Sequence, residues 1–293
     1  MHRPPPVEAP AFRHRLALVL GSGGVRSVAA VGIVEALARE GIRPDLVVGC
    51  SSGAIFGATI AHGMTPRDAL AAATSLWSQE LTQQKRWWAL AQLAAPRLTG
   101  FGADFALRDS RLIARRLEQA FGGVWLEELA TPLRVAATDA LRGEPVVLTR
   151  GRLVDALLAS IAVPFIFESV LVGGRRLVDG VISDPLPIAA AADAQVVLTL
   201  GFEGAMPRRV DRPSRMVAQI STALINNLQR ARVAAASAAG QRVLALELEL
   251  ERRVGLWETA ALPRAYEAGT RAAIARLPEI ARLLAATPRA RAA

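Results

Sequence analysis

Cysteine and histidine are both scarce in this chain of 293 residues. Cys50 is the only cysteine, and histidine occurs only at His2, His14 and His62. A single thiol excludes an internal disulfide and most thiolate metal sites. The few histidines, none of them in an H-E-x-x-H pair, argue against metal catalysis. We therefore expect a protein that needs neither a metal nor another cofactor.

Long uncharged apolar runs are also missing. The best candidate covers residues 156–167, lies between Asp155 and Glu168 and contains Pro164. It is shorter than the roughly 20 residues that a membrane-spanning helix needs. The N-terminus contains three consecutive prolines and lacks the apolar centre of a signal peptide. These features predict a disordered lead-in over residues 1–14 and a cytoplasmic location, with a peripheral position at a membrane left open.

Acidic residues are outnumbered, and the net charge is +9. Lys85 is the only lysine among 35 basic residues, so arginine carries nearly all of the positive charge. A basic balance of this size can favour nucleic acid or an anionic membrane. The arginines are spread along the chain without a long run, which favours an ordinary solvated surface. We expect no nucleic-acid partner, while a weak preference for anionic lipid surfaces stays open.

A repeated strand-loop-helix pattern occupies the first part of the chain. The apolar run Leu16–Leu20 is typical of a buried parallel strand, and a glycine-rich loop and a helix over Val28–Glu40 follow it. The run Asp45–Val48 begins a second unit, whose helix covers Ala54–Ala61. Consecutive units of this kind place their loops on the same edge of a parallel sheet. The length allows one large α/β domain or two small ones.

The glycine-rich loop over residues 21–27 suits two kinds of site. A dinucleotide-binding G-x-G-x-x-G loop would need a third glycine where Arg26 stands, and no Gly-Lys-Ser/Thr follows as in a P-loop. The other use of such glycines is an oxyanion hole, in which their N–H groups approach a developing negative charge. Gly23 and Gly24 suit that role, although a plain tight turn before a helix also explains the loop.

The pentapeptide Gly49-Cys50-Ser51-Ser52-Gly53 joins the strand and the helix of the second unit. It has the G-x-S-x-G pattern of a nucleophile elbow, in which small neighbours allow a serine to occupy a strained turn. The N–H of Ser52 opens the helix and can face an oxyanion. The pattern alone does not separate a nucleophile from an ordinary turn, but its position beside the glycine loop favours Ser51 as nucleophile. Cys50 is interpreted as a small buried spacer.

The base for this serine has to be found without histidine. In an α/β-hydrolase triad the histidine follows the serine and the acid, but no histidine follows His62, which we place at the end of the helix after the elbow. A carboxylate must then act as the base, and burial has to raise its pKa. Asp179, followed by Gly180 in a turn after a predicted strand, is the best candidate. It would form a dyad with Ser51 that works through an acyl-enzyme. Asp139 also ends a strand, but turn chemistry is the favoured explanation there.

Trp87 and Trp88 follow the basic pair Lys85 and Arg86 in a region that is harder to interpret. A core-packing helix with aromatic anchors is the favoured interpretation. The alternative is an interfacial lid that touches lipid, since aromatic residues beside cationic side chains are typical of helices at a membrane surface.

The rest of the chain continues the alternation of strands and helices. Further strands are predicted at Pro132–Thr138, Pro145–Leu148, Val170–Val172, Arg175–Val178, Ala194–Gly201 and Gln241–Glu249. Further helices are predicted at Pro66–Leu81, Ser110–Ala120, Leu153–Ile161, Arg215–Ala239 and Ala261–Ala286. Residues 205–214, rich in arginine and proline, are predicted to form a loop.

Together these motifs resemble the patatin-like phospholipases, in particular the compact bacterial members. The resemblance rests on the glycine loop at residues 21–26, the elbow at residues 49–53, and the pair Asp179-Gly180. The block from residue 159 to Phe167 and the run Pro185-Leu186-Pro187 also look like the family. The similarity extends from about residue 16 to residue 201, and the order, spacing and strand contexts of the motifs agree.

The resemblance implies a three-layer α/β/α fold with a mostly parallel central sheet, and a Ser-Asp dyad that hydrolyses acyl esters of lipids. It implies Ser51 as nucleophile and Asp179 as base. It also implies an oxyanion hole made by the N–H groups of Gly23 and Gly24, with Arg26 at the family's basic position.

Two positions depart from the family pattern. Ser27 stands where glycine is usual, and Val181 stands where a second glycine or alanine is common. Ser27 could tighten the loop. Neither departure removes a catalytic group.

The expected function is that of a serine lipid acyl hydrolase of phospholipase A or lysophospholipase type. An acyltransferase or thioesterase with the same dyad, and a non-catalytic lipid-binding regulatory protein, stay open as alternatives. The expected partners are a phospholipid or another acyl ester and, transiently, a membrane surface. Residues 15–205 are predicted to form the catalytic domain, and residues 206–293 an extension that packs on it.

Overall fold

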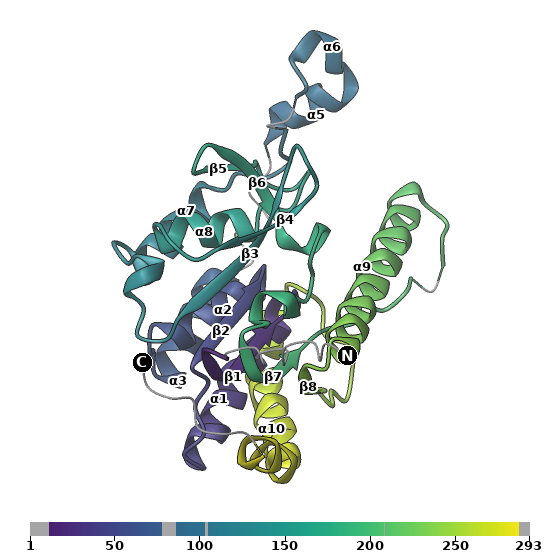
Figure 1. The fold of residues 1–293 in the computed structure, drawn as a ribbon. Coiled ribbons are helices and arrows are strands. Elements are labelled where there is room, and N and C mark those ends of the chain that lie inside the picture. Colours follow the sequence, from purple (N-terminus) through teal and green to yellow (C-terminus); the bar gives the residue numbers. More distant parts are fainter. Residues whose placement is uncertain (1–11, 78–85, 103–104, 208, 287–293) are drawn as a thin grey trace, which may run out of the picture.

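A central eight-stranded sheet organises the chain (Figure 1), which a computed structural model describes over residues 12–77, 86–102, 105–207 and 209–286. The strand order is β5-β6-β3-β2-β1-β7-β8, with β4 paired to β3. The strands are β1 (His14–Leu20), β2 (Leu46–Cys50), β3 (Leu133–Asp139), β4 (Pro145–Leu148), β5 (Val170–Val172), β6 (Arg175–Asp179), β7 (Ala194–Leu200) and β8 (Arg242–Ala245).

Helices connect most of these strands. The α-helices are α1 (Ala29–Arg39), α2 (Ser52–Ala61), α3 (Pro66–Leu76), α5 (Trp87–Ala94), α6 (Pro96–Thr99), α7 (Arg111–Phe121), α8 (Leu153–Ser160), α9 (Pro213–Ala238) and α10 (Leu262–Ala285). Short 3-10 helices are η1 (Gly24–Val28), η2 (Leu126–Glu128), η3 (Gly180–Ile182), η4 (Ile188–Ala191) and η5 (Thr259–Ala261). In the part of the chain that the structure describes, no helix is both long enough and apolar enough to cross a membrane.

The strands β3, β2, β1, β7 and β8 run parallel to one another. The pairings of β4 and β6 with β3, and of β5 with β6, are antiparallel. The prediction of an α/β fold with a mostly parallel sheet is therefore confirmed. The antiparallel pairing of β6 with β3 matters for the site, because it places Asp179 at the end of β6 beside Ala137 of β3.

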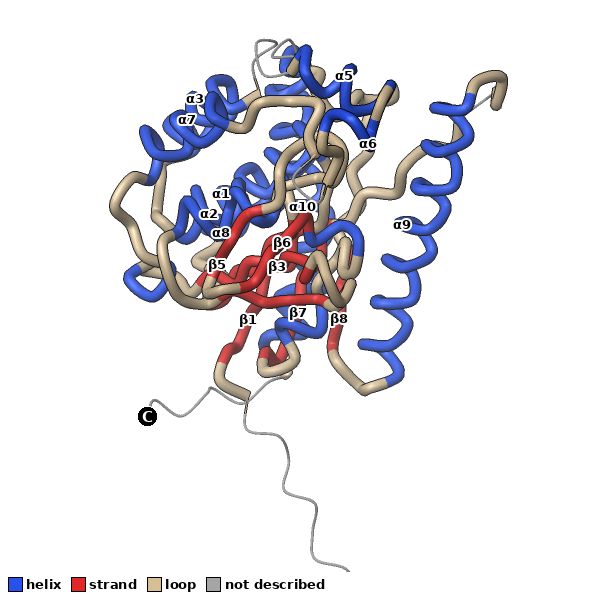
Figure 2. Tube along the Cα trace, turned by 90° about the horizontal axis from the view of Figure 1, so that it is seen from above, coloured by secondary structure: helices blue, strands red, loops and turns tan. Residues whose placement is uncertain are grey.

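Helices cover both faces of the sheet (Figures 1 and 2). Leu16, Leu18 and Leu20 of β1 belong to the larger core, which they share with α1, α2, α8 and α10. Ala17 and Val19 belong to a second core, against which η4 and the C-terminal half of α9 pack. Successive side chains of a strand point to opposite faces, so one strand contributes to both cores. The result is a three-layer α/β/α arrangement.

The last helix, α10, packs directly on the first, α1. A Cβ atom on Gly269 would lie 2.1 Å from the carbonyl oxygen of Ala29, and one on Gly32 would lie 2.2 Å from that of Tyr266. The two backbones approach this closely because both contact positions are glycines. The contact holds the C-terminal part of the chain against the helix that follows the glycine loop.

The ends of several strands differ from the sequence prediction, and the differences at β8 and β1 have a clear structural reason. β8 ends at Ala245 rather than Glu249, because the ladder with β7 stops there and Leu246 adds one last hydrogen bond, to the carbonyl of Thr199 at 2.8 Å. His14 is the first residue of β1 rather than part of the lead-in, since it pairs with β7.

Other predictions fall partly outside the described residues. The helix predicted over Pro66–Leu81 ends at Leu76 as α3, and the stretch predicted to continue it from residue 78 lies outside the described residues. Lys85 and the lead-in as far as residue 11 also lie outside them.

The close approach of α10 to α1 predicts a localised sensitivity to bulk. Gly269→Val should lower the free energy of unfolding by about 1–3 kcal/mol, because its side chain would overlap the backbone of Ala29. Ala275→Val, at an exposed position of the same helix, should cost less than about 1 kcal/mol. Urea unfolding followed by circular dichroism measures both. Equal losses in the two variants would contradict the packing described here.

Candidate active site

Ser51 occupies a sharp turn between β2 and α2. Its backbone has φ 55° and ψ −124°, in a region that residues other than glycine rarely adopt. A Cβ atom on Gly49 would lie 2.5 Å from the Cα of Ala54, and one on Gly53 would lie 2.4 Å from the carbonyl oxygen of Leu20. Close backbone packing therefore requires both glycines of the G-x-S-x-G pattern. The turn has the geometry of a nucleophile elbow.

A buried hydroxyl from α8 holds this turn. The Ser51 N–H donates to Ser160 Oγ at 2.8 Å, and the Ser160 hydroxyl donates to the carbonyl of Ala136 on β3 at 2.6 Å. Ser160 is fully buried, so both hydrogen bonds are shielded from water. Ser160 is not among the site residues predicted from the sequence. The available signal was its place in the block after residue 159 that contributed to the family resemblance.

Asp179 is the last residue of β6 and is fully buried. Its Oδ2 accepts a hydrogen bond from Ser51 Oγ at 2.8 Å, and its Oδ1 accepts one from the N–H of Val181 at 2.8 Å. Burial raises the pKa of Asp179 to about 7, against the opposing effect of these two hydrogen bonds. A carboxyl group with that pKa is divided between its acid and base forms near neutral pH, which suits a general base.

The turn after Asp179 is tied to β3. A Cβ atom on Gly180 would lie 2.7 Å from the carbonyl oxygen of Ala136, so glycine is needed for this approach. The hydroxyl of Thr138 donates to the carbonyl of Asp179 at 2.9 Å. The carboxylate is therefore positioned by backbone contacts as well as by its own hydrogen bonds.

Asp184 is a second buried carboxyl group close to this turn, and it is not among the residues predicted from the sequence. Arg232 of α9 donates from Nε to Asp184 Oδ1 at 3.0 Å and from Nη2 to the carbonyl of Ser183 at 3.0 Å. Burial raises the pKa of Asp184 to about 6, and Arg232 partly offsets that rise. Because an arginine binds its carboxylate, Asp184 has a partner of its own and anchors the chain after η3 to α9.

The glycine loop lies beside the elbow, as the sequence predicted, but its N–H groups have a partner there. Those of Gly23 and Gly24 donate to Ser52 Oγ at 3.0 and 2.8 Å. Ser52 Oγ also lies 2.9 Å from Ser27 Oγ. A hydroxyl oxygen has two lone pairs, and the two N–H groups use both, so Ser52 is the donor to Ser27.

This arrangement bears on the expected oxyanion hole. The N–H groups of Gly23 and Gly24 point at Ser52 Oγ, so an oxyanion would have to share or replace that acceptor. The N–H of Ser52 itself lies in the first turn of α2, where N–H groups have no acceptor within the helix. Ser27, which departs from the family pattern, completes the hydrogen bonding of the Ser52 hydroxyl. The oxyanion role of the two glycines therefore stays a prediction.

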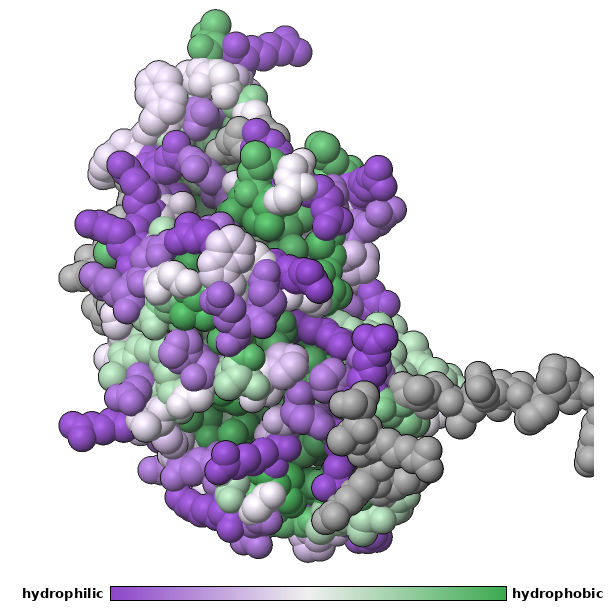
Figure 3. Space-filling model, turned by 60° about the vertical axis from the view of Figure 1, so that its left-hand side comes forward, coloured by the Kyte–Doolittle hydropathy of each residue, from purple (hydrophilic) through white to green (hydrophobic). Residues whose placement is uncertain are grey.

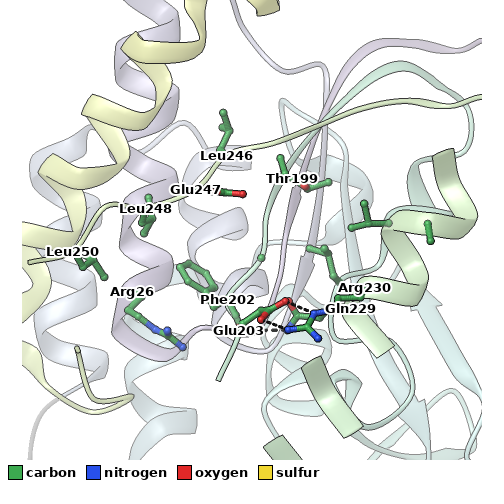
Figure 4. A pocket seen from close by; sticks show the side chains of 15 residues that line it. Arg26, Thr199, Phe202, Glu203, Gln229, Arg230, Leu246, Glu247, Leu248 and Leu250 are labelled. Atoms are coloured by element: carbon green, nitrogen blue, oxygen red, sulfur yellow. Dashed lines mark hydrogen bonds and ion pairs between the residues drawn. The ribbon is translucent and has the colours of Figure 1, made fainter. Parts of the chain in front are cut away.

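Arg26 does not join the dyad. Its Nε donates to the carbonyl of Gly23 at 3.1 Å, and its guanidinium carbon lies 4.9 Å from the centroid of the Phe202 ring. It lines a separate pocket of about 590 Å³ between α9 and residues 245–250, shown in Figure 4. An ion pair between Glu203 and Arg230, at 2.6 Å, borders the same pocket.

The dyad opens into a different, largely apolar pocket of about 260 Å³. Ser51 and Asp179 contribute its polar groups, together with Ser22 and Ser52 from the two loops. Its apolar walls include Trp77, Ile113, Ile161, Phe167, Ile225 and Trp257. An apolar pocket with a few convergent polar groups suits a ligand with a hydrocarbon part and one reactive polar group.

Three residues outside the dyad have the structural roles that the sequence favoured. Cys50 is buried, and burial followed by the carboxyls of Asp179 and Asp184 raises the pKa of its thiol well above the usual range, which fits a spacer. Asp139 Oδ1 accepts hydrogen bonds from the N–H groups at positions 141 and 142, at 2.9 and 3.0 Å, so the turn explanation is confirmed. His62 caps the end of α2 and meets an aromatic ring of α7 edge-on.

Among the described residues, no cluster of three or more His, Cys, Asp or Glu side chains could hold a metal.

The interpretation of Trp87 and Trp88 as anchors of a core-packing helix is wrong. Their side chains are 75% and 62% exposed, because α5 and α6 project from the body of the protein (Figure 1). A short apolar helix in a core and one on a projection have the same sequence pattern, so only the packing distinguishes them.

The chain belongs to the patatin-like phospholipase family, because the sequence model of that family matches residues 18–192. The family predicted from the motifs is thereby confirmed, and membership in it supports hydrolysis of lipid esters at the level of the family.

Two relatives found by sequence agree with this assignment. An uncharacterized NTE family protein of Mycobacterium tuberculosis is 34% identical over 204 residues, which is 68% of this chain and 53% of that protein. Patatin-like phospholipase domain-containing protein 7 of Rattus norvegicus is 30% identical over 190 residues, covering 63% of this chain and 13% of that protein. The chain thus spans about half the length of the mycobacterial relative. Among solved structures, VipD from Legionella pneumophila has a TM-score of 0.45 at 14% identity, covering 94% of this chain and 67% of that one.

The hydrogen bonds of Ser160 predict a measurable contribution to stability. Ser160→Ala leaves the Ser51 N–H without its buried acceptor, which should cost about 1–3 kcal/mol of unfolding free energy. Ser237→Ala, at an exposed position of α9, should change stability by less than about 0.5 kcal/mol. Chemical denaturation compares the two variants. Equal stability would mean that the Ser160 hydroxyl does not hold the elbow.

Proposed function

We propose that the protein is a serine lipid acyl hydrolase of phospholipase A or lysophospholipase type, with Ser51 as nucleophile and Asp179 as base. The observation that carries this proposal is the 2.8 Å hydrogen bond from Ser51 Oγ to a buried carboxylate at the floor of an apolar pocket. Membership in the patatin-like phospholipase family supports it.

The proposed reaction has two halves that share one base. Asp179 Oδ2 takes the proton of Ser51 as Oγ attacks the ester carbonyl, and a tetrahedral intermediate forms. The bond from the carbonyl carbon to the alcohol oxygen then breaks, and the alcohol leaves with the proton from Asp179. In the second half Asp179 takes a proton from water, which attacks the acyl-enzyme. Breaking the bond to Ser51 Oγ releases the fatty acid and returns the proton to the serine.

Charge on the tetrahedral oxygen needs N–H donors close to Ser51. The N–H of Ser52 is one proposed donor, because it follows the nucleophile at the start of α2. The N–H groups of Gly23 and Gly24 are proposed as further donors once the Ser52 hydroxyl turns away from them. Arg26 is proposed to support this loop through its hydrogen bond to Gly23, rather than to touch the reacting atoms.

Two alternatives use the same pocket. An acyltransferase or thioesterase would form the same acyl-enzyme and differ only in the acceptor or the leaving group. Product analysis with and without an added alcohol separates transfer from hydrolysis. A non-catalytic lipid-binding protein would require an unreactive Ser51, and failure of a fluorophosphonate probe to label Ser51 would favour that reading.

The proposed catalytic unit covers residues 15–205, with residues 206–293 as an extension on the same domain. The place of β8 in the shared sheet and of α10 on α1 supports that division. The proposed substrates are phospholipids or other acyl esters, with transient contact to the membrane that holds them. A cytoplasmic location stays a prediction.

Replacing the nucleophile tests the proposal directly. Ser51→Ala should lower kcat/KM for a soluble p-nitrophenyl acyl ester by at least about 10³-fold, because no attacking group replaces the hydroxyl. Circular dichroism should show an unchanged fold, and Ser237→Ala should keep full activity. Undiminished turnover by Ser51→Ala would sink the assignment.

The raised pKa of Asp179 has a consequence for stability that does not depend on substrate. Because its pKa in the folded state, about 7, lies above the ordinary value of 3.8, the group stabilises the fold most below about pH 4. That contribution is lost as the pH rises through about 7. Asp179→Asn carries no charge, so relative to wild type it should gain melting temperature between pH 5 and pH 8.

The measurement is thermal unfolding of both proteins at the two pH values. Asp184 and all other groups titrate in both proteins and cancel in the difference. A difference in melting temperature that is independent of pH would contradict the raised pKa.

A further inference from the structure

Large apolar side chains are exposed on two projecting elements of the fold. We define the α5–α6 arm as residues 86–102 and the α9 arm as residues 209–225. Figure 1 shows that α5, α6 and the beginning of α9 project on the same side of the molecule. In Figure 3 hydrophobic surface gathers below the projection at the top of the view.

The α5–α6 arm is apolar around most of its circumference. Trp87 is 75% exposed, Trp88 62% and Leu98 89%, and Leu90 and Leu93 are about half exposed. A helix that is apolar on all sides is ordinarily buried, and a contiguous exposed apolar patch marks an interaction site. The arm therefore lacks a covering partner among the described residues.

The charges of the α5–α6 arm have one sign. Arg86 and Arg97 are its charged residues, and it contains no acidic residue. Arg86 forms an ion pair with Glu168 of the body, which ties the base of the arm to the loop before β5.

The α9 arm repeats this combination. Met216, Val217, Ile220 and Leu224 are between 54% and 64% exposed. Their spacing places them along one side of the helix. Every residue from 211 to 218 is exposed, so the first two turns of α9 stand clear of the body.

Arginine also dominates the charge of the α9 arm. Arg209, Arg212 and Arg215 precede or begin the helix, and Asp211 is the single acidic residue. Asp211 pairs with Arg215 at 2.7 Å. Arg209 and Arg212 have no carboxylate within ion-pair distance among the described residues, so the arm keeps a positive surplus.

Both arms connect to the pocket of the dyad. Ile225, the residue after the exposed Leu224, lines that pocket. On the other side, the Phe105 ring lies 4.8 Å from Phe101 of the α5–α6 arm and 5.9 Å from Phe165. Phe165 belongs to the loop whose neighbouring residues line the pocket, and its φ of 69° is unusual for a bulky residue.

We propose that the α5–α6 arm and the α9 arm insert their apolar side chains into the surface of an anionic phospholipid bilayer. The pocket of Ser51 would then lie at the boundary between lipid and water. This inference deepens the proposed function and rests on it for the role of the pocket, although the docking itself is independent of catalysis.

A bilayer fits these surfaces better than a second copy of the chain. Tryptophan and leucine with flanking arginine are the composition of helices that lie in the headgroup region, and anionic lipids attract the arginines. Association of arms between two copies would place arginine against arginine, which like-charge repulsion opposes.

The experiment uses the full chain carrying Ser51→Ala, so that lipid is not consumed during binding. It is sedimented with vesicles of phosphatidylglycerol and phosphatidylcholine in equal parts, and with vesicles of phosphatidylcholine alone. One variant carries Trp87→Gln, Trp88→Gln and Leu98→Gln, and a second carries Val217→Gln and Ile220→Gln. The matched control is Ile274→Gln on α10, since Ile274 is 52% exposed and Ile220 is 55% exposed.

The proposal predicts tighter binding to the anionic vesicles, and weaker binding as salt is raised. Each arm variant should lower the affinity by about tenfold or more, while the control binds like the parent. With Ser51 restored, the arm variants should lose turnover of vesicle lipid and keep turnover of a soluble p-nitrophenyl ester.

Three outcomes would overturn the proposal. In the first, the parent protein binds neither kind of vesicle. In the second, the arm variants bind as tightly as the control. In the third, light scattering shows that the parent is a dimer and the arm variants are monomers, while vesicle binding is the same in all of them. The last result would assign the arms to a second copy. A wrong proposed function would give a different result: the protein with Ser51 intact would not hydrolyse the soluble ester, while its sedimentation with vesicles would be as predicted.

Discussion

The hydrogen bond between Ser51 Oγ and the buried carboxylate of Asp179 is the interaction on which the proposed chemistry depends. No histidine lines the pocket among the described residues, so the carboxylate has to be basic by itself, and burial supplies that basicity by raising its pKa to about 7. The fold brings the two side chains together because the two strands that carry them run in opposite directions. Parallel β2 delivers the serine to the edge of the sheet, and antiparallel β6 delivers the aspartate to the same place from the opposite direction.

Several features of the site cost stability, and the surrounding packing offsets them. Ser51 has an unfavourable backbone conformation, and Asp179 is buried with no cationic side chain bound to it in the described part of the chain. Ser160 ties the elbow to β3, and Thr138 ties the acid turn to the same strand. Strand β3 therefore holds both the turn of Ser51 and the turn after Asp179. It is itself held on both sides, by its pairing with β2 and with β6.

Much of the site could be predicted from the sequence, because its features are local. The glycines around Ser51, the missing downstream histidine and the turn at Asp179 each have a backbone or chemical meaning that spacing alone conveys. Ser160 and Asp184 could not be found this way, since their roles depend on partners far away in the chain. The exposure of Trp87 is of the same kind, because an apolar helix has one pattern whether it packs inside a core or projects from it. The hydrogen bonds from Gly23 and Gly24 to Ser52 Oγ could not be predicted either, since they depend on how two loops meet in space.

The central claim is that Asp179 serves Ser51 as its base, and the rate at which a fluorophosphonate labels Ser51 measures this most directly. Labelling requires the serine to lose its proton as it attacks phosphorus, so the rate should follow ionisation of the base. We expect a rate that rises with pH through about 7 in the wild type and is lost in Asp179→Asn. A rate that stays unchanged in Asp179→Asn would contradict it.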